Sequence, residues 1–235
     1  MRKDEQYVEI CQKATATEFL KNDNNFLLIY RTSLPMRVLV VAPTGREYKY
    51  MRSTLDAAQN TKHDYTLICS GIGKAGAAAG VMNAVARAEQ PFEAVAVIGF
   101  AAGSADFKQG DVVAPNTTVY HDCDVPAGFI PELTDPYTLA GTDAVTVFTG
   151  DSFINTASAT EIMNRFNTAS AIFDMEIMAV AIAVRDYAGG VPLLAVKFIS
   201  DVPQSGHNEW SYDEFADSHS DFSPLLSKIE SLLNN

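Results

Sequence analysis

Continuous apolar runs are the clearest pattern along the chain. They predict buried strands over residues 37–42, 65–69, 94–98 and 193–199. Runs that are apolar at successive positions, rather than at alternate ones, are typical of parallel sheets covered on both faces. The four runs therefore indicate a sheet with helices on each side.

Helical segments alternate with these strands. The pattern predicts helices over residues 46–58, from about 76 to 88, and over 159–165, 176–187 and 221–233. Ser158 can cap the third helix, with Glu161 at capping-box spacing and Thr156 as the alternative cap. Gly189-Gly190 is a suitable C-terminal signal for the fourth. A polar loop is expected over residues 202–211.

A β-rich section interrupts this alternation. Residues 109–114, 117–120 and 144–148 predict further strands, residues 171–173 predict a short one, and a loop rich in Pro and Asp is expected over residues 121–143. Strands alternating with helices, together with this section, predict an α/β domain of three layers.

The first 35 residues are predicted to be a separate element. A helix is expected over residues 3–20, a turn over 21–25 and a strand over 26–31. Pro35 breaks this strand before Met36 opens a new one. We therefore expect an N-terminal extension over residues 1–35 and a main domain over residues 36–235.

Composition narrows the partners and the compartment. The chain has 235 residues and a net charge of −12, which argues against nucleic acids and anionic membranes as partners. Its three cysteines lack CxxC spacing, which argues against a disulfide framework or a structural zinc site and fits a reducing compartment. Residues 1–25 lack the apolar core of a secretory signal, and no apolar run reaches transmembrane length. We expect a cytoplasmic protein.

A glycine motif follows the second core strand. Gly71-x-Gly73-x-x-Gly76 opens a helix, as a dinucleotide-binding fingerprint does. It does not follow the first core strand, and Glu89 and Glu93 do not lie clearly at the tip of another strand, so NAD(P) binding is the weaker interpretation. A tight turn without ligand, or a loop that touches a sugar or a small polar substrate, remains open. Lys74 is followed by alanine, so this is no Walker motif.

Acidic residues stand at two element ends within residues 173–201. Asp174-Met175-Glu176 precedes a predicted helix, and Asp201 follows Ser200 at the end of a predicted strand. Open α/β sheets bind ligands at the carboxyl ends of strands. However, a lone Asp there is as well explained as a cap or a turn former, Glu176 by the helix dipole, and Glu47 in the first helix by solvation. Spacing alone does not define these residues as one site.

Taken in order, several segments resemble the purine nucleoside phosphorylase/nucleosidase superfamily, and most of all its methylthioadenosine/S-adenosylhomocysteine nucleosidases. The segments are MRVLVVAPTGREY, SGIGKAGAAAG, IGFAAGS, GDVVAPNTTVYHDCDV, FTGDSFI, FDMEIMAVA, VKFISDV and SYDEF. They cover residues 36 to about 233. The resemblance implies a three-layer αβα fold with a central mixed, partly barrel-like sheet. It also implies cleavage of the N-glycosidic bond of a purine nucleoside, no cofactor, and a homodimer.

The resemblance also assigns roles to single residues. Asp201 matches the general acid that protonates or hydrogen-bonds purine N7, and Ser200 supports it. Glu176 matches the carboxylate that holds the ribose hydroxyls, and Met175 packs beneath the sugar. The remaining matches are Phe153, which stacks on the base, Ile154, whose main chain reads the base edge, and Ile72 and Ala101, which line the sugar and the 5′ side.

Glu47 decides which nucleophile the resemblance implies. The nucleosidases carry a glutamate here that activates water as general base, whereas the bacterial phosphorylases carry a phosphate-binding arginine in this region. Alignment on the first strand places Glu47 at the glutamate position, with Arg46 beside it. A second phosphate-binding arginine has no counterpart in residues 97–100. Because phosphate calls for arginine or backbone donors, water is favoured, and phosphorolysis is the alternative.

The 5′ side departs from the family pattern. Phe100 stands where the nucleosidases usually carry serine, and the segment between residues 47 and 70 is shorter. Phe129 and Tyr212 are approximate candidates for the 5′ pocket, and Phe129 is expected to act across a dimer. The resemblance therefore leaves methylthioadenosine, futalosine-type nucleosides, adenosine and other purine nucleosides open as substrates.

Two further hypotheses concern function. A non-catalytic nucleoside-binding protein is suggested by Phe100 and the shortened segment, although the joint presence of Asp201, Glu176 and Glu47 argues against it. A metal site at His121, with its neighbouring Asp residues, is disfavoured because no second ligand cluster is evident and the chemistry of the family uses no metal. We expect no metal.

Overall fold

The computed structural model describes residues 34–123, 125–126, 134–203 and 209–234, and two short strands before them. These strands, β1 (Lys21–Asn22) and β2 (Asn25–Phe26), pair antiparallel and take up the first two residues and the last residue of the turn expected over residues 21–25. The helix expected over residues 3–20 and most of the strand expected over 26–31 lie outside the described residues. Contacts divide the chain into residues 1–34 and 35–235, and the exact division at residue 35 stays a prediction.

In the described part of residues 35–235, nine strands form one mixed sheet in the order β4-β3-β5-β10-β9-β7-β8, with β11 paired to β5 and to β6. The strands are β3 (Arg37–Ala42), β4 (Asp64–Cys69), β5 (Ala94–Gly103), β6 (Val112–Val113), β7 (Pro115–Tyr120), β8 (Tyr137–Thr138), β9 (Asp143–Thr149), β10 (Ala171–Asp174) and β11 (Leu193–Asp201). β5 branches the sheet, because it pairs parallel with β3 and β11 and antiparallel, at its last residues, with β10.

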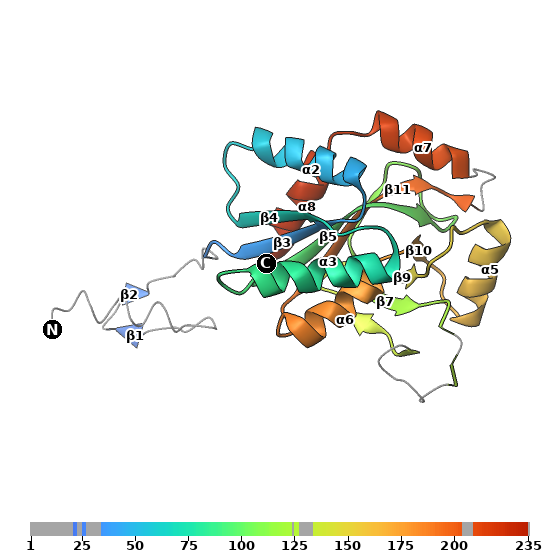
Figure 1. Cartoon of the computed structure of the whole chain (residues 1–235), viewed down its shortest axis with the longest axis horizontal. Helices are drawn as coiled ribbons and strands as arrows, with labels where there is room; N and C mark the ends of the chain where they lie inside the picture. The colour runs from blue at the N-terminus through green and yellow to red at the C-terminus, as the bar shows by residue number, and fades with distance from the viewer. Residues whose placement is uncertain are drawn as a thin grey trace. The chain divides into compact units, whose positions relative to one another are not determined.

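Helices cover both faces of the sheet. They are α2 (Gly45–Ala57), α3 (Gly73–Arg87), α5 (Thr156–Arg165), α6 (Ile177–Tyr187), α7 (Glu209–Ser218) and α8 (Ser223–Leu233). α2, α7 and α8 lie on one face, and α3 and α6 lie on the other (Figure 1). The predicted three-layer αβα fold with a central mixed sheet is confirmed. Among the described helices, none is both long enough and apolar enough to cross a membrane.

Alternate side chains of the central strands enter opposite cores. Leu39 and Val41 pack in a core with α3 and α6, whereas Val38 and Val40 pack in a core with α2, α7 and α8. All four side chains are fully buried. This two-sided burial explains why the strand is apolar at successive positions.

β5 continues beyond its predicted end at residue 98. The predicted end is wrong, because residues 99–103 complete the strand, which pairs there with both β10 and β11. Gly99 lies inside the strand with φ of 132°. Glycine adopts this backbone region without strain, so here it marks a special strand position rather than a turn.

The start of α5 also differs from prediction, and α7 was not predicted at all. α5 begins at Thr156, and its cap is Asn155, whose Oδ1 accepts a hydrogen bond of 3.0 Å from Ser158 N. Neither Ser158 nor Thr156 is the cap, and the Thr156 hydroxyl donates to Pro203 O instead. The loop expected over residues 202–211 is shorter than predicted, because α7 begins at Glu209.

Candidate active site

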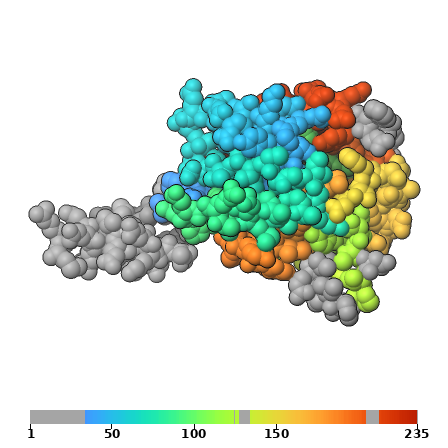
Figure 2. Space-filling view, viewed as in Figure 1, coloured from blue at the N-terminus to red at the C-terminus, as the bar shows by residue number. Residues whose placement is uncertain are grey.

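One cavity lies where the carboxyl ends of β3, β5 and β11 meet the start of α6. The surfaces of α2, α3, α5 and α7 come together on this side of the domain (Figure 2). The cavity is lined by these sequence-predicted residues: Glu47, Ile72, Ala101, Phe153, Ile154, Met175, Glu176, Ser200, Asp201 and Tyr212. Phe129 lies outside the described residues. Segments far apart in the sequence are thus brought to one place.

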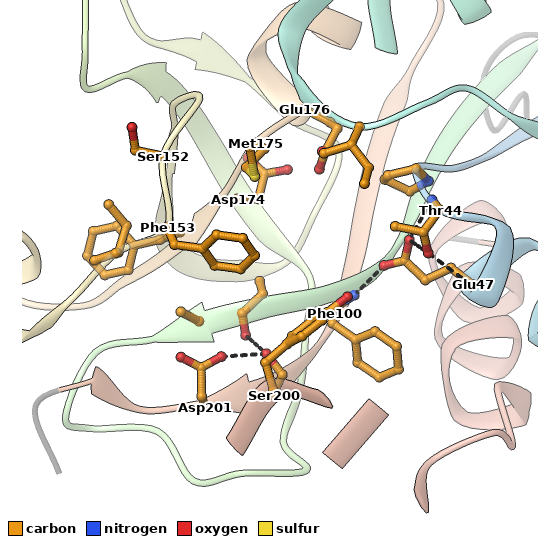
Figure 3. Close-up of a pocket in the computed structure, with 17 residues that line it drawn as sticks. Thr44, Glu47, Phe100, Ser152, Phe153, Asp174, Met175, Glu176, Ser200 and Asp201 are labelled. Atoms are coloured by element: carbon orange, nitrogen blue, oxygen red, sulfur yellow. Dashed lines mark hydrogen bonds between the residues drawn. The ribbon is translucent and has the colours of Figure 1, made fainter. Parts of the chain in front are cut away.

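The lining residues occupy distinct sides of this cavity (Figure 3). Asp201 and Phe153 lie on one side, Glu47 on the opposite side, and Met175 and Glu176 between them. A ligand in the cavity can therefore meet a carboxylate at each end and a third one along its length.

Glu47 belongs to a capping box at the start of α2. Its Oε2 accepts hydrogen bonds from Thr44 N at 2.9 Å and Thr44 Oγ1 at 2.7 Å, and Thr44 Oγ1 accepts one from Glu47 N at 3.2 Å. Its Oε1 accepts a hydrogen bond of 3.0 Å from Phe100 N. The side chain is buried, so the interpretation of Glu47 as a solvated helix residue is wrong. Reciprocal capping and the bond to β5 fix its carboxylate at the cavity wall.

Gly99 makes room for this carboxylate. A Cβ atom at position 99 would collide with Glu47 Oε1. Glycine is therefore required twice over at this position, for its positive φ and for the close approach of Glu47.

Glu176 is the N-cap residue of α6, but its side chain makes no capping hydrogen bond to that helix. Its Oε1 accepts a hydrogen bond of 3.0 Å from Gly73 N, the first residue of α3. Glu176 is buried, and burial, followed by the charge of Asp174, raises its pKa to about 7. Desolvation and a nearby like charge both disfavour the ionised carboxylate, so Glu176 changes its charge near neutral pH.

Asp174 supplies a side-chain hydrogen bond to the start of α6. Its Oδ2 accepts from Ile177 N at 3.0 Å, and its Oδ1 accepts from the Thr149 hydroxyl at 2.7 Å. Asp174 also lines the cavity. Sequence reasoning noticed its acidity but gave it no role. The signal was its position three residues before Ile177, a spacing at which an Asp side chain can accept from a backbone N–H.

Asp201 ends β11 and is half-buried. Ser200 Oγ lies 2.6 Å from Asp201 Oδ1 and 3.2 Å from Ala101 O, so its single hydrogen can be donated to either oxygen. Ser200 itself is buried. The serine therefore orients the carboxyl group against the end of the neighbouring strand β5.

Aromatic side chains close another part of the wall. Tyr212 meets Phe100 with ring centroids 6.0 Å apart and Phe153 with centroids 6.3 Å apart. Phe153 is 69% exposed, so its ring is available to stack on a flat ligand. Burial, followed by the charge of Glu47, holds the pKa of Tyr212 above its usual value, so its hydroxyl keeps its proton.

Sequence reasoning missed a buried cation beside the cavity. Lys197 lies on β11, is fully buried, and places Nζ 3.7 Å from Asp174 Oδ2. Its signal was a lysine inside an apolar run, LLAVKFISD. Lysine is almost never fully buried unless it is paired.

The glycine motif has a structural explanation. Gly71 and Gly73 have φ of 95° and 77°, which only glycine adopts freely. The first two N–H groups of α3 are taken by carboxylates, since Gly73 N donates to Glu176 and Lys74 N donates to Asp151 Oδ1 at 3.0 Å. In a dinucleotide-binding fold the pyrophosphate would lie at this helix terminus. Two carboxylates stand there instead, which argues against NAD(P) binding.

Arg46 lies outside the cavity wall. Its guanidinium pairs with Asp213 at 3.1 Å and Asp217 at 3.4 Å, both on α7. It therefore links α2 to α7 instead of facing a ligand.

His121 is buried beneath Gly150, where a Cβ atom would collide with its ring. Burial lowers its pKa, so the ring is neutral at physiological pH. Within the described ranges, no group of three or more His, Cys, Asp or Glu side chains is arranged to hold a metal ion. Asp124, which the sequence placed near His121, lies outside those ranges.

Comparison with known proteins agrees with this fold. The family model of the phosphorylase superfamily matches residues 35–232. A 5′-methylthioadenosine/S-adenosylhomocysteine nucleosidase of Haemophilus influenzae (strain PittGG) is 34% identical over 193 residues, which span 72% of this chain and 79% of the relative. A second strain, 86-028NP, has a nucleosidase of the same name that is 33% identical.

Solved structures match the same fold. The 5′-methylthioadenosine/S-adenosylhomocysteine nucleosidase of Streptococcus pneumoniae with a transition-state inhibitor has a TM-score of 0.68 and 24% identity, and covers 85% of this chain and 99% of its own. The corresponding enzyme from Colwellia psychrerythraea 34H, in complex with adenine, has a TM-score of 0.69 and 22% identity, with coverage of 85% and 96%.

A three-layer αβα fold with a carboxylate-lined cavity at its strand ends, together with the family match, defines the class: the chain belongs to the phosphorylase superfamily. Within that superfamily, its sequence relatives group it with the methylthioadenosine/S-adenosylhomocysteine nucleosidases.

Proposed function

We propose that this protein is a hydrolase that cleaves the N-glycosidic bond of a purine nucleoside. Asp201 gives a proton to N7 of the base, and the C1′–N9 bond breaks with its electron pair leaving on the purine. A water oxygen bonds to C1′, and the proton of that water passes to Glu47. Glu176 holds the ribose hydroxyls above Met175. The products are the free base and the free ribose derivative.

The observation that carries this proposal is the separation of Asp201 and Glu47 across one cavity, with Glu176 between them (Figure 3). Glycosidic cleavage needs an acid at the leaving base and a base for water on the opposite face of the sugar. It also develops positive charge on the ribose, which nearby carboxylates stabilise. The exposed ring of Phe153 supports stacking on the purine.

Water is proposed as the nucleophile because the cavity disfavours phosphate. Its described lining contains four carboxyl groups, those of Glu47, Asp174, Glu176 and Asp201, and no Lys, Arg or His side chain. Arg46, the other candidate for a phosphate ligand, pairs with two aspartates of α7. A phosphate dianion would meet repulsion without a compensating arginine, whereas a neutral water would not.

The 5′ side is proposed to accept a substituent beside Tyr212 and Phe100. The named substrates of the relatives, 5′-methylthioadenosine and S-adenosylhomocysteine, are therefore the first nucleosides to test. Phe100 packs against Phe198, Phe215 and Tyr212, so it adds apolar surface to this wall. Ile72 and Ala101 are proposed to line the sugar and 5′ side, and the main chain of Ile154 to read the base edge.

The direct test incubates the protein with a panel of purine nucleosides, with and without phosphate, and identifies the products by mass. We expect free base and free ribose derivative at the same rate in both conditions. Formation of a ribose 1-phosphate only when phosphate is present would replace hydrolysis by phosphorolysis. Binding of a nucleoside without any turnover would support the non-catalytic alternative.

Assembly and location are proposed from the family resemblance and the composition. We expect a homodimer, in which Phe129 of one subunit reaches the 5′ pocket of the other. Sedimentation velocity would test the dimer. A cytoplasmic location is proposed because the three cysteines lack a pattern that needs oxidation.

A further inference from the structure

Lys197 occupies a position that is unusual for a lysine. It lies in the middle of β11, four residues before Asp201, and opposite Gly99 of β5 in the parallel register. Its side chain has no solvent exposure. A buried ammonium group costs several kcal/mol of desolvation unless charged or polar partners offset it, so its surroundings indicate why the residue is there.

The partner of this ammonium group is a carboxylate of the cavity wall. Nζ lies 3.7 Å from Asp174 Oδ2, and both side chains are almost completely buried. No hydrogen-bond acceptor for Nζ is found among the described residues. Lys197 therefore acts on Asp174 through charge across a short gap, with hydrogen-bonding capacity to spare.

Asp174 links Lys197 to Glu176, the residue proposed to hold the ribose. Its two oxygens are already fixed by Thr149 and by the N-terminus of α6. Glu176 follows two positions later on the same turn and faces the cavity. The turn that carries both carboxylates is thus anchored on one side by hydrogen bonds and on the other by the ammonium group.

We propose that Lys197 is a positioning residue for ribose binding: its ammonium group holds Asp174 in place and favours the ionised form of the neighbouring Glu176 carboxylate, which is directed at the sugar. This inference rests on the proposed function. Lys197 does not line the cavity and touches no substrate, so it acts through these two acidic residues.

The charges around Glu176 determine in which direction its pKa should change when Lys197 is removed. Four groups from other elements surround the Glu176 carboxylate. They are Asp174 on β10, Glu47 on α2, Tyr212 on α7 and the N–H of Gly73 at the start of α3. The negative charges of Asp174 and Glu47 raise the pKa of Glu176, while Lys197 and the Gly73 N–H lower it. Without the ammonium group, Glu176 would take up a proton at higher pH, and the ribose hydroxyls would lose an ionised acceptor.

The test compares Lys197→Met, which keeps a long unbranched side chain but removes its charge, with Lys197→Arg, which keeps the positive charge. Lys228→Met is the control, because Lys228 is a partly exposed lysine whose Nζ lies 3.7 Å from Asp143 Oδ1. We expect Lys197→Met to move the acidic limb of the kcat/KM profile to higher pH. At pH values on the acidic side of the profile, each pH unit by which the limb moves lowers kcat/KM about tenfold. We expect this loss to come mainly from a higher KM.

Lys197→Arg should recover most of this loss, and the control should match the unmodified protein. An unchanged pH profile and KM in a folded Lys197→Met protein would overturn the proposal, as would equal losses in the Met and Arg variants. If Lys197→Met does not fold, the double variant Asp174→Asn/Lys197→Met removes both charges together. The proposal then requires its acidic limb to lie at higher pH than that of Asp174→Asn alone, and identical limbs would overturn it.

Failure of the proposed function has a different signature. If the unmodified protein cleaves no nucleoside in the panel, the nucleosidase proposal fails. The charge relation of Lys197 with Glu176 is then measured by the pH dependence of urea unfolding. We expect the pH at which the stability changes to be higher in Lys197→Met than in the unmodified protein, but not in Lys197→Arg. If the plots of stability against pH coincide for Lys197→Met and the unmodified protein, the inference on Lys197 alone is overturned.

Discussion

The four carboxyl groups of the cavity differ in how the fold holds them. Glu47, Asp174 and Glu176 are buried, and each accepts a hydrogen bond from a backbone N–H at the start of a helix: α2, α6 and α3 respectively. Asp201 is half-buried at the end of β11, and one of its oxygens accepts from the Ser200 hydroxyl. Three carboxyl groups are thus held at helix termini, whereas the fourth lies at the end of a strand.

This difference matches the different tasks proposed for the two kinds of group. A helix N-terminus fixes a carboxylate in position and favours its negative charge. Such anchoring suits groups that must hold ribose hydroxyls or receive a proton from water. The proposed acid must instead give a proton away, and a hydroxyl neighbour on a strand end accommodates both protonation states of Asp201.

The substitution Asp201→Asn tests this difference between the carboxyl groups most strongly. We expect kcat to fall by about 10²–10⁴, because the amide cannot donate a proton to the leaving base, while KM changes little. Steady-state kinetics at saturating nucleoside would measure the loss, with circular dichroism to check folding. Ser200→Ala is the matched control, since it removes the hydrogen bond but keeps the acid, and its loss should be much smaller. A turnover of the Asn variant equal to that of the unmodified protein would remove Asp201 from the mechanism.

Gly99→Ala tests the anchoring of Glu47 without altering the carboxylate. The added Cβ would collide with Glu47 Oε1, so the carboxylate must leave Phe100 N, and we expect kcat to fall by about 10²-fold or more. Gly189→Ala is the control, because Gly189 also has a positive φ, of 72°, but nothing within 4 Å of an added Cβ. That variant should lose about 1–2 kcal/mol of stability and keep its activity. Equal kinetic losses in both variants would contradict the role of the close approach.

The smallest effect is the pH dependence of stability that comes from Glu176. Its pKa is raised from 4.5 to about 7 in the folded protein, so the native state binds more protons than the unfolded state between these values. The free energy of unfolding should therefore fall as pH rises through this range, by at most about 1.4 kcal/mol per pH unit from this residue. Urea unfolding from pH 4.5 to 8 would measure it, and Glu176→Gln should give a flatter curve. Parallel curves would mean that Glu176 is already ionised in the native protein.

The sequence predicted the central layers because their physical cause is local. Residues 37–42 are buried on both faces of a sheet, and that demand leaves a continuous apolar run. β5 was predicted too short, because its last part contains Gly99 and Gly103, which are typical of turns. The glycine at 99 exists for Glu47, a residue 52 positions away, and no local pattern carries that information. α7 was missed because its residues, EWSYDEFADS, are mostly polar or acidic.

The candidate site followed from ordered motifs rather than from spacing. The resemblance proposed Asp201, Glu176 and Glu47 together, and the fold places all three around one cavity. It offered nothing on Lys197 or on the bond between Asp174 and the start of α6, because the pairing of Lys197 with Asp174 depends on β11 and β10 meeting through the fold. The 5′ side was the least predictable, since it depends on loop lengths, and Phe129 lies outside the described residues.

The bond between Gly73 N and Glu176 has a consequence for folding. It joins residues 103 positions apart, so the loop it closes carries a large entropic cost that only the assembled sheet can offset. The cavity is therefore a product of the completed topology and cannot persist in a fragment that holds only one half of the chain. Contacts of such long sequence separation also slow the search for the native state. Enzymatic turnover would accordingly report the arrival of the last core elements, well after the first helices have formed.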